Sequence, residues 1–266
     1  MPPTPLILLP PSEGKTTGGT GGPWSPAAMS FPELAPTRGR VAAGLRRACR
    51  AKLADRAKLF GVKGEALAAA TATNREVFDS PTLPAIERYS GVLYQALDHG
   101  SLSARDRRRL DAQVVIFSGL MGLVTPSDPI PDYKLKMGAS LPGVGKVSSV
   151  WRPQIDAALT VRTAGRTIWN LLPNEHAAAW SGADPTAAEI TVRFVDDVER
   201  NGARTLVTVS HWNKLLKGAL VRHVVGHQLR EPDGLERFEH PQGYVYRPEL
   251  TETVGGRTTV TMVARR

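Results

Sequence analysis

Short apolar runs bounded by glycine, proline and polar residues recur along the chain, and their lengths are typical of β-strands. The first run is Leu6-Ile-Leu-Leu9, which ends at two prolines. The second is Gln113-Val-Val-Ile-Phe117, which is apolar enough for a fully buried strand. Further strands are predicted at 167–171, 190–195, 204–210, 243–246 and 258–264.

A four-residue spacing of apolar positions predicts helices between these strands. Val41, Leu45, Cys49 and Leu53 follow this spacing and predict one helix with a single apolar stripe. Further helices are predicted at 64–72, 82–97, 154–161 and 213–229. The sequence contains no internal repeat and no linker long enough to divide it. It therefore predicts one mixed α/β (α+β) domain over residues 1–266, with a mixed sheet, flanking helices and a basic helical insertion at about residues 36–75.

The segment 117–138 combines glycine, proline, serine and aspartate with interleaved apolar residues. A structureless loop of this length is uncommon in a compact domain unless it is functional. Leu120, Met121 and Leu123 make it too apolar for a disordered segment. We therefore expect an ordered loop at the end of a buried strand, where α/β sheets carry their sites.

The net charge of +9 and the single cysteine narrow the possible partners and the compartment. Such an excess of positive charge attracts polyanions, so nucleic acid, acidic lipid and phosphorylated small molecules are candidate partners, although an arginine-rich proteome would give the same composition. Cys49 alone excludes an intramolecular disulfide and a thiolate zinc cluster, which favours the cytoplasm. The first eleven residues fit neither a signal peptide nor a membrane span, so no membrane partner is expected.

The segment Phe60-Gly-Val-Lys-Gly-Glu-Ala-Leu-Ala68 resembles a helix-hairpin-helix element, although its glycine spacing is one residue longer than usual. In that motif a glycine turn presents backbone N–H groups to a DNA phosphate. An ordinary C-terminal glycine followed by a second helix is the alternative. The predicted nucleic-acid contacts come from this insertion and one later lysine: Arg46, Arg47, Arg50, Lys58, Gly61, Lys63, Gly64 and Lys134.

Ser12-Glu-Gly-Lys-Thr16 follows the first strand and resembles the end of a phosphate-binding loop. The full motif requires glycine at the position of Leu9, so nucleotide hydrolysis is not expected. A metal-dependent nuclease would require an upstream aspartate, and residues 1–12 contain no acid. Glu13 and Lys15 therefore either point into a cleft or belong to a solvated turn.

Two more polar clusters lie near predicted strand ends. Ser210-His-Trp-Asn-Lys-Leu-Leu-Lys-Gly218 begins a predicted helix, on which Lys214 and Lys217 share one face. Asn174-Glu-His176 follows another predicted strand. His223 and His227 have the spacing of a zinc-binding pair, but Val224 stands where a metalloprotease has glutamate, so surface or packed histidines are preferred. No metal and no cofactor are expected.

Several separated segments together resemble the bacterial peroxide-stress protein YaaA family over nearly the full length. They are Leu8-Leu-Pro-Pro-Ser-Glu-Gly-Lys15, Tyr89-Ser-Gly-Val-Leu-Tyr94, Ser118-Gly-Leu-Met-Gly-Leu-Val124, Pro126-Ser-Asp128, Pro131-Asp-Tyr133, Leu135-Lys-Met-Gly138, Trp151, Asn170-Leu-Leu172 and Lys214-Leu-Leu-Lys-Gly218. The chain departs from the family at Thr125 and Lys134, where arginine is frequent, and at Lys136, where glutamate is common. The resemblance implies one α/β domain with a helix-hairpin-helix-like element and a positively charged cleft. It also implies DNA binding and protection of DNA during hydrogen peroxide stress.

Two classes of function stay open beside a basic domain that shares only the fold. The first is a DNA-binding protein that contacts the phosphate backbone. The second is an enzyme in which a desolvated lysine forms a Schiff base, either a glycosylase- or lyase-like enzyme on DNA or one acting on a small anionic, nucleobase-like or amine compound. Its predicted catalytic residues are Ser12, Glu13, Lys15, Ser118, Asp128, Tyr133, His211, Asn213, Lys214 and Lys217.

Overall fold

The computed structural model describes residues 3–184, 186–200, 202–208, 213–240 and 242–266, and the predicted mixed α/β class is confirmed. Within these residues a nine-stranded sheet has the order β12-β14-β10-β9-β1-β4-β5, with β11 paired to β10 and β13 paired to β14. The strands are β1 (Leu6–Leu9), β4 (Val114–Ser118), β5 (Gly122–Val124), β9 (Thr167–Asn170), β10 (Ala188–Arg200), β11 (Ala203–Thr208), β12 (Val245–Tyr246), β13 (Glu252–Val254) and β14 (Arg257–Arg265).

The centre of this sheet is parallel and its margins are antiparallel. β1 is parallel to β4 and β9, while β5 and β12 join antiparallel to their neighbours. All four residues of β1 are buried, which explains why its sequence is continuously apolar rather than alternating. Because β1, β4 and β9 run in the same direction, their carboxyl ends lie at one edge of the sheet.

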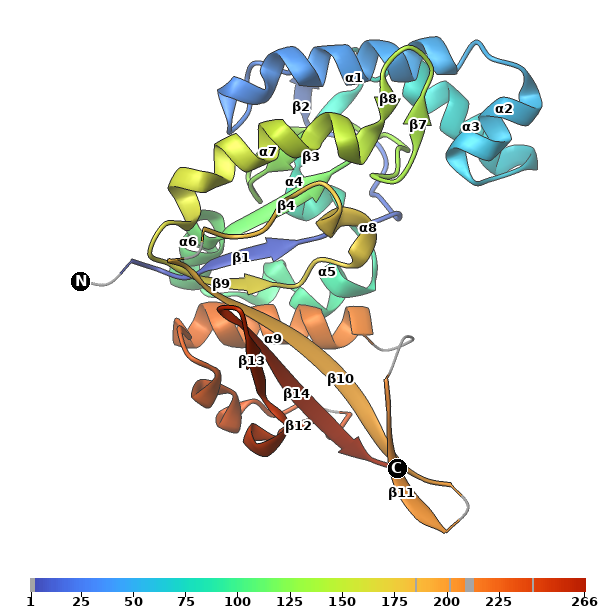
Figure 1. Cartoon of the computed structure of the whole chain (residues 1–266). Helices are drawn as coiled ribbons and strands as arrows, with labels where there is room; N and C mark the ends of the chain where they lie inside the picture. Colours follow the sequence, from blue (N-terminus) through green and yellow to red (C-terminus); the bar gives the residue numbers. More distant parts are fainter. Residues whose placement is uncertain (1–2, 185, 201, 209–212, 241) are drawn as a thin grey trace.

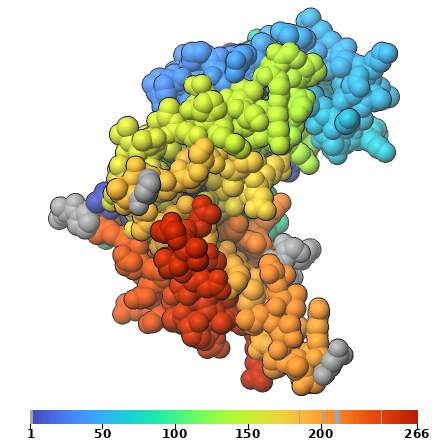
Figure 2. All heavy atoms as spheres, viewed as in Figure 1, coloured from blue at the N-terminus to red at the C-terminus, as the bar shows by residue number. Residues whose placement is uncertain are grey.

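Helices and small sheets surround this sheet, as Figure 1 shows. The helices are α1 (Ala35–Ala48), α2 (Leu53–Phe60), α3 (Gly64–Arg75), α4 (Ala85–Arg88), α5 (Val92–Leu97), α6 (Ala104–Gln113), α7 (Val147–Thr163), α8 (Asn174–Ala177) and α9 (Asn213–His227), with 3-10 turns η1 (Pro32–Leu34), η2 (His99–Ser101), η3 (Pro232–Arg237) and η4 (Pro248–Leu250). The small sheets are β2 (Gly21–Pro23) with β3 (Pro81–Pro84) and β6 (Pro129–Ile130), and β7 (Ser140–Leu141) with β8 (Gly145–Lys146). The α1–α3 segment and the β10–β11 hairpin lie at opposite ends of the molecule (Figures 1 and 2).

Two predicted helices are wrong. The stripe through Leu53 does not form, because α1 ends at Ala48 and Leu53 begins α2 with its side chain 66% exposed. The predicted helix at 82–97 divides into β3, α4 and α5. It is interrupted where Ser90 donates a backbone hydrogen bond to the Gly14 carbonyl and Tyr89 forms a β-bridge with Lys15. A long-range pairing with the loop after β1 therefore overrides local helical preference.

The segment 117–138 is ordered and largely buried, as its composition predicts. Arg38 of α1 stabilises this segment from inside the protein. Its side chain is fully buried and donates hydrogen bonds to the carbonyls of Met121 and Leu123 at 3.0 and 2.9 Å. It also bonds the Ser30 carbonyl at 2.7 Å. A guanidinium supplies enough donors to satisfy several loop carbonyls at once.

Candidate functional site

Three buried hydroxyl groups lie together at the carboxyl end of β4, and we call them the hydroxyl trio. The Tyr133 hydroxyl lies 2.8 Å from that of Tyr89 and 2.9 Å from Ser118 Oγ. Ser118 Oγ accepts a hydrogen bond from the backbone N–H of Met121 at 3.1 Å, which fixes its position. Burial raises the pKa of Tyr133 to about 12 and that of Tyr89 well above its ordinary value. Both phenols are therefore neutral and available as hydrogen-bond donors at physiological pH.

Lys15 packs against this trio. Its Nζ lies 4.3 Å from the ring centroid of Tyr133 and 5.7 Å from that of Tyr89. It also donates a hydrogen bond to the Ser12 carbonyl at 3.0 Å. Burial lowers the pKa of Lys15 to about 8, although the charges of Asp132 and Glu13 oppose this shift. An appreciable fraction of this amine is therefore uncharged near neutral pH.

Glu13 brings further charged groups to the same edge. Its Oε2 accepts a hydrogen bond from Lys134 Nζ at 2.9 Å. Burial acts to raise the pKa of Glu13, but the hydrogen bond from Lys134 and the charges of Lys134, Lys136 and Lys15 outweigh burial, and the pKa is lowered. The carboxylate is thus held ionised among three cations. The structure pairs Lys134 with this carboxylate, whereas the sequence analysis expected Lys134 to contact nucleic acid.

α8 adds two side chains to the site. Glu175 Oε1 accepts a hydrogen bond from the Gly138 backbone N–H at 2.9 Å. Burial lowers the pKa of His176, with Glu13 and Lys214 close enough to act on it electrostatically. The His176 Nδ1 atom is buried and has no hydrogen-bond partner among the described residues. An unsatisfied buried ring nitrogen is costly, so it marks a position where a ligand group or water would be stabilised.

The first turn of α9 borders this group of residues. Lys217 Nζ donates a hydrogen bond to the Leu171 carbonyl at 2.9 Å, and burial lowers its pKa to about 8. Lys214 is exposed, whereas Asn213 Oδ1 is buried without a partner among the described residues. His211 and the predicted helix cap Ser210 lie outside the described residues.

The residues described in the preceding paragraphs lie at one edge of the sheet and include a large part of the predicted catalytic set. We call this whole group of residues the strand-end site. Ser12, Glu13, Lys15, Ser118 and Tyr133 are linked by the contacts above, while Lys214 acts on the pKa of His176. Sequence reasoning did not select Tyr89 as a site residue. Its only signal was the Tyr89-Ser-Gly segment, whose bridge to Lys15 requires the fold.

Asp128 lies in a different environment. Its two carboxylate oxygens accept backbone hydrogen bonds from Ser30 and Thr125, each at 2.7 Å. The residue is buried, and its charge also acts on Arg38. These contacts show Asp128 holding the loop that follows β5, and none of them joins it to the hydroxyl trio.

Apart from Lys134, the predicted nucleic-acid residues lie on α1, on α2, in the turn between these two helices and in the Gly61–Gly64 turn. α2 ends at Phe60, Gly61 follows with φ of 65°, and α3 begins at Gly64 with φ of 55°. Two helices joined by a glycine turn therefore exist here, but a phosphate-binding helix-hairpin-helix stays a prediction. The predicted cations of this segment are all exposed: Arg46, Arg47, Arg50, Lys58 and Lys63.

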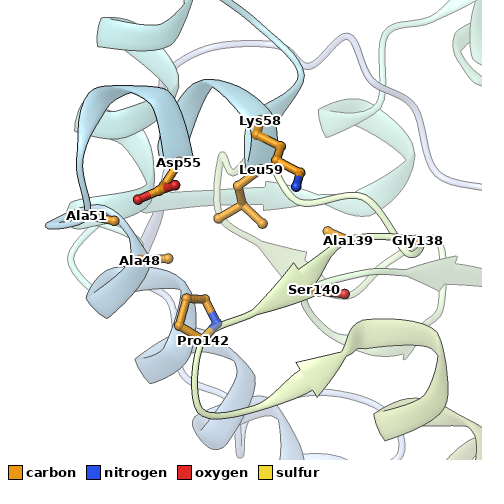
Figure 3. A pocket seen from close by; sticks show the side chains of 9 residues that line it. All are labelled: Ala48, Ala51, Asp55, Lys58, Leu59, Gly138, Ala139, Ser140 and Pro142. Atoms are coloured by element: carbon orange, nitrogen blue, oxygen red, sulfur yellow. The ribbon is translucent and has the colours of Figure 1, made fainter.

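A pocket of about 500 Å³ separates these helices from the segment that leads to α7 (Figure 3). Its walls are small and apolar, with Asp55 and Lys58 on one side and Ser140 on the other. Gly138 belongs to this pocket and also bonds Glu175 of the strand-end site. The pocket and the strand-end site are thus joined through one short segment of chain.

The described residues contain no group of three or more histidine, cysteine, aspartate or glutamate side chains arranged to hold a metal ion. The rings of His223 and His227 lie 4.3 Å apart, and His223 Nε2 is 3.0 Å from the Gly234 carbonyl. These histidines are packed on α9, as the sequence analysis preferred. In the part of the chain that the structure describes, no helix is long and apolar enough to cross a membrane.

Comparison with known proteins agrees with the resemblance seen in the sequence. The sequence pattern of the family described as "Peroxide stress protein YaaA" matches residues 6–250. A UPF0246 protein of Streptomyces coelicolor is 37% identical over 221 residues, which cover 83% of this chain and 82% of the relative. A UPF0246 protein of Corynebacterium efficiens is 33% identical over 260 residues, which cover 97% of this chain and 99% of the relative. The chain therefore belongs to the YaaA family of peroxide stress proteins.

Proposed function

We propose that this protein binds DNA in the cytoplasm during peroxide stress and protects it from oxidative damage. The family places the chain among peroxide stress proteins. The observation that carries the DNA-binding proposal is the exposed cation set of α1 and α2 beside the Gly61–Gly64 turn. Arginine and lysine side chains neutralise backbone phosphates without reading base sequence.

The turn adds donors to these charges. The first backbone N–H groups of a helix have no partner within the helix. At α3 no side chain caps them, because Lys63 occupies the cap position without a capping hydrogen bond. Gly61 and Gly64 have no side chains, so a phosphate oxygen can approach the backbone at these two positions. Lys63 would then supply a charge at the same phosphate.

The salt dependence of DNA binding tests this proposal. Fluorescence anisotropy with a labelled duplex should give an affinity that falls with salt, with a log–log slope of about −0.9 for each neutralised phosphate. The double variant Arg50→Gln, Lys63→Gln removes two cations, so the slope should become shallower by the contribution of about two phosphate contacts. The matched control is Arg105→Gln, Arg108→Gln, which removes two exposed cations of α6. If both double variants lose the same amount of DNA affinity, binding depends on net charge alone and the turn has no specific role.

A second candidate function is enzymatic, and the strand-end site favours it. Burial lowers the pKa values of Lys15 and Lys217 to about 8, and the Lys15 amine packs over the rings of Tyr133 and Tyr89, whose buried hydroxyls bond to each other and to Ser118. Ionisable groups with perturbed pKa values concentrate at catalytic sites. We propose either a glycosylase- or lyase-like reaction on DNA or a transformation of a small nucleobase-like or amine compound. Strand cleavage of abasic and 8-oxoguanine duplexes, together with product analysis on free nucleobases, tests this candidate.

A further inference from the structure

Lys15 differs from the other lysines of the strand-end site in what surrounds its amine. Its Nζ packs on the faces of Tyr133 and Tyr89, whose hydroxyls belong to the trio with Ser118. The residue as a whole is only partly buried, and exposed Glu13 stands two positions before it. Among the described residues, it is the lysine of this site that packs directly on the hydroxyl trio.

Lys217 provides the closest comparison. Burial lowers its pKa to about 8 as well, and its Nζ likewise bonds a backbone carbonyl, that of Leu171. The described contacts of Lys217 place no tyrosine hydroxyl beside its amine. Both lysines therefore have a deprotonated fraction, but in the described contacts it is Lys15 whose amine packs on tyrosine rings, and the hydroxyls of those tyrosines are groups that can transfer a proton.

We propose that Lys15 is the nucleophile of the strand-end site, that it forms an imine with an aldehyde carried next to a negative charge, and that Tyr133 moves the protons of this reaction. This inference rests on the enzymatic candidate function. The aldehyde is the substrate class because imine formation is the characteristic reaction of a desolvated lysine with carbonyl compounds. The neighbouring negative charge follows from two exposed lysines of the site: Lys136 acts electrostatically on Glu13, and Lys214 acts on His176.

The bond changes balance without an external oxidant or reductant. The neutral amine of Lys15 attacks the carbonyl carbon, a C–N bond forms, and the carbonyl oxygen takes a proton to give a carbinolamine. The nitrogen then loses its second proton and the C–O bond breaks, so that water leaves and a C=N bond remains. Tyr133 donates a proton to the leaving oxygen and regains one from the nitrogen, relayed through Tyr89 and Ser118.

Two sources supply an aldehyde beside an anion: the opened sugar of an abasic site, which is flanked by phosphates, and a small oxo-acid such as glyoxylate. The two probes are therefore a DNA duplex with an abasic site and glyoxylate. Each probe is incubated with the full-length protein and sodium cyanoborohydride, which reduces an imine to a stable secondary amine. Peptide mass spectrometry then locates the modified lysine. Trapping by the abasic duplex alone assigns the site to DNA, and trapping by glyoxylate alone assigns it to a small compound.

We expect the adduct on Lys15 with at least one probe. Lys15→Arg keeps the positive charge but removes the nucleophilic amine, so trapping should fall by about tenfold or more. Lys146→Arg, at an exposed lysine outside the strand-end site, is the control and should trap within about twofold of the parent protein. Lys15→Gln serves as a second variant if the arginine does not fit, with a thermal melt to confirm folding. An adduct on Lys217 or spread over exposed lysines, or no adduct with either probe, overturns the proposal.

The role of Tyr133 has its own readout. Tyr133→Phe should lower the trapping rate by about tenfold while the pH midpoint of trapping stays near that of the parent protein. A merely structural role would instead change the melting temperature and leave the rate of the folded protein unaltered. If product forms but no lysine is trapped, the Lys15 proposal is wrong and the enzymatic candidate stands. If Lys15 is trapped but no product forms, the enzymatic candidate is wrong and Lys15 is only a reactive amine.

Discussion

The Nζ of Lys134 lies 2.9 Å from Oε2 of Glu13, although 121 residues separate them in the chain. This contact joins the loop that follows β1 to the segment that follows β6. Both segments lead into the strand-end site, so the ion pair fixes the spacing of its two sides. The exposed Lys136 lies next to the Gly61 turn, because its Nζ would be 3.7 Å from a Cβ placed on Gly61.

Glu13→Gln should have a small, pH-dependent effect on stability. The pKa of Glu13 is lowered in the folded protein, so its contribution is present above the unfolded pKa and is lost as pH falls through the folded pKa. The Glu13 side chain is 55% exposed, which limits the contribution to less than about 1 kcal/mol. Urea unfolding at pH 7 and pH 3 should show a smaller difference between parent and variant at the lower pH. A difference that grows on acidification would contradict this assignment.

Arg38→Met should be among the most destabilising substitutions in the chain. It leaves several buried carbonyls without a donor and removes the cation near Asp128, so we expect a loss of about 3 kcal/mol or more. Arg40→Met is the matched control, because Arg40 is exposed on the same helix and should change stability by less than about 0.5 kcal/mol. Urea denaturation of both variants measures the contrast. Similar midpoints would show that Arg38 does not hold the loop.

Gly122→Ala should destabilise the protein through both backbone and packing. Gly122 has φ of 74°, and a Cβ there would lie 2.7 Å from the ring of Trp151. The left-handed backbone alone costs roughly 1 kcal/mol, and the clash adds a further 1–3 kcal/mol. Gly165→Ala isolates the backbone cost, since Gly165 has φ of 64° with no atom within 4 Å of the new Cβ. Thermal melts should therefore place Gly122→Ala clearly below Gly165→Ala.

Asp128→Asn separates a structural role from a catalytic one. The amide can accept only one of the two backbone hydrogen bonds from Ser30 and Thr125, so we expect a loss of about 1–3 kcal/mol in stability. The folded variant should still give the Lys15 adduct at the rate of the parent protein, because no contact of Asp128 reaches the hydroxyl trio. If the Asp128→Asn variant is as stable as the parent protein but no longer forms the Lys15 adduct, Asp128 has a catalytic role.

Asp132→Asn should shift the reactivity of Lys15 toward lower pH. Burial is the largest cause of the lowered Lys15 pKa, and the charge of Asp132 is the main influence that opposes it. Without that charge the pKa should fall below about 8, so a larger fraction of the amine is neutral at pH 7. The pH dependence of reductive methylation at Lys15, followed by mass spectrometry, measures the shift. A pKa that rises in the variant would contradict the assignment of the Asp132 charge.

The elements that the sequence predicted best are those set by local pattern. The buried strand at 113–117 and the helix beginning at Asn213 agree with β4 and α9 to within a few residues, because continuous apolar runs and helical spacing determine them directly. The helix predicted at 154–161 lies in the C-terminal half of α7, which begins before Pro153 and continues through it. Its first turns were missed because an internal proline usually marks a boundary.

The predictions that failed depend on contacts between distant parts of the chain. Nothing in the local sequence distinguishes Arg38 from its exposed neighbour Arg40, since burial of Arg38 follows from carbonyls more than eighty residues away. Tyr89 was likewise missed as a site residue because its partner Tyr133 is 44 positions away. The strand-end site itself was predictable, because strands such as β1 and β4 end in polar clusters and parallel strands bring such ends together.

The position of β1 in the sheet has a consequence for biosynthesis. β1 is made first, yet its neighbours pair Ile7 with Val114 on one side and Trp169 on the other. A nascent chain therefore carries an unpaired apolar strand until translation has passed both partners, and closure of such long loops slows folding. Ribosome-bound intermediates that end before Trp169 should accordingly depend on holdase chaperones, and the completed sheet should form as a late, cooperative event.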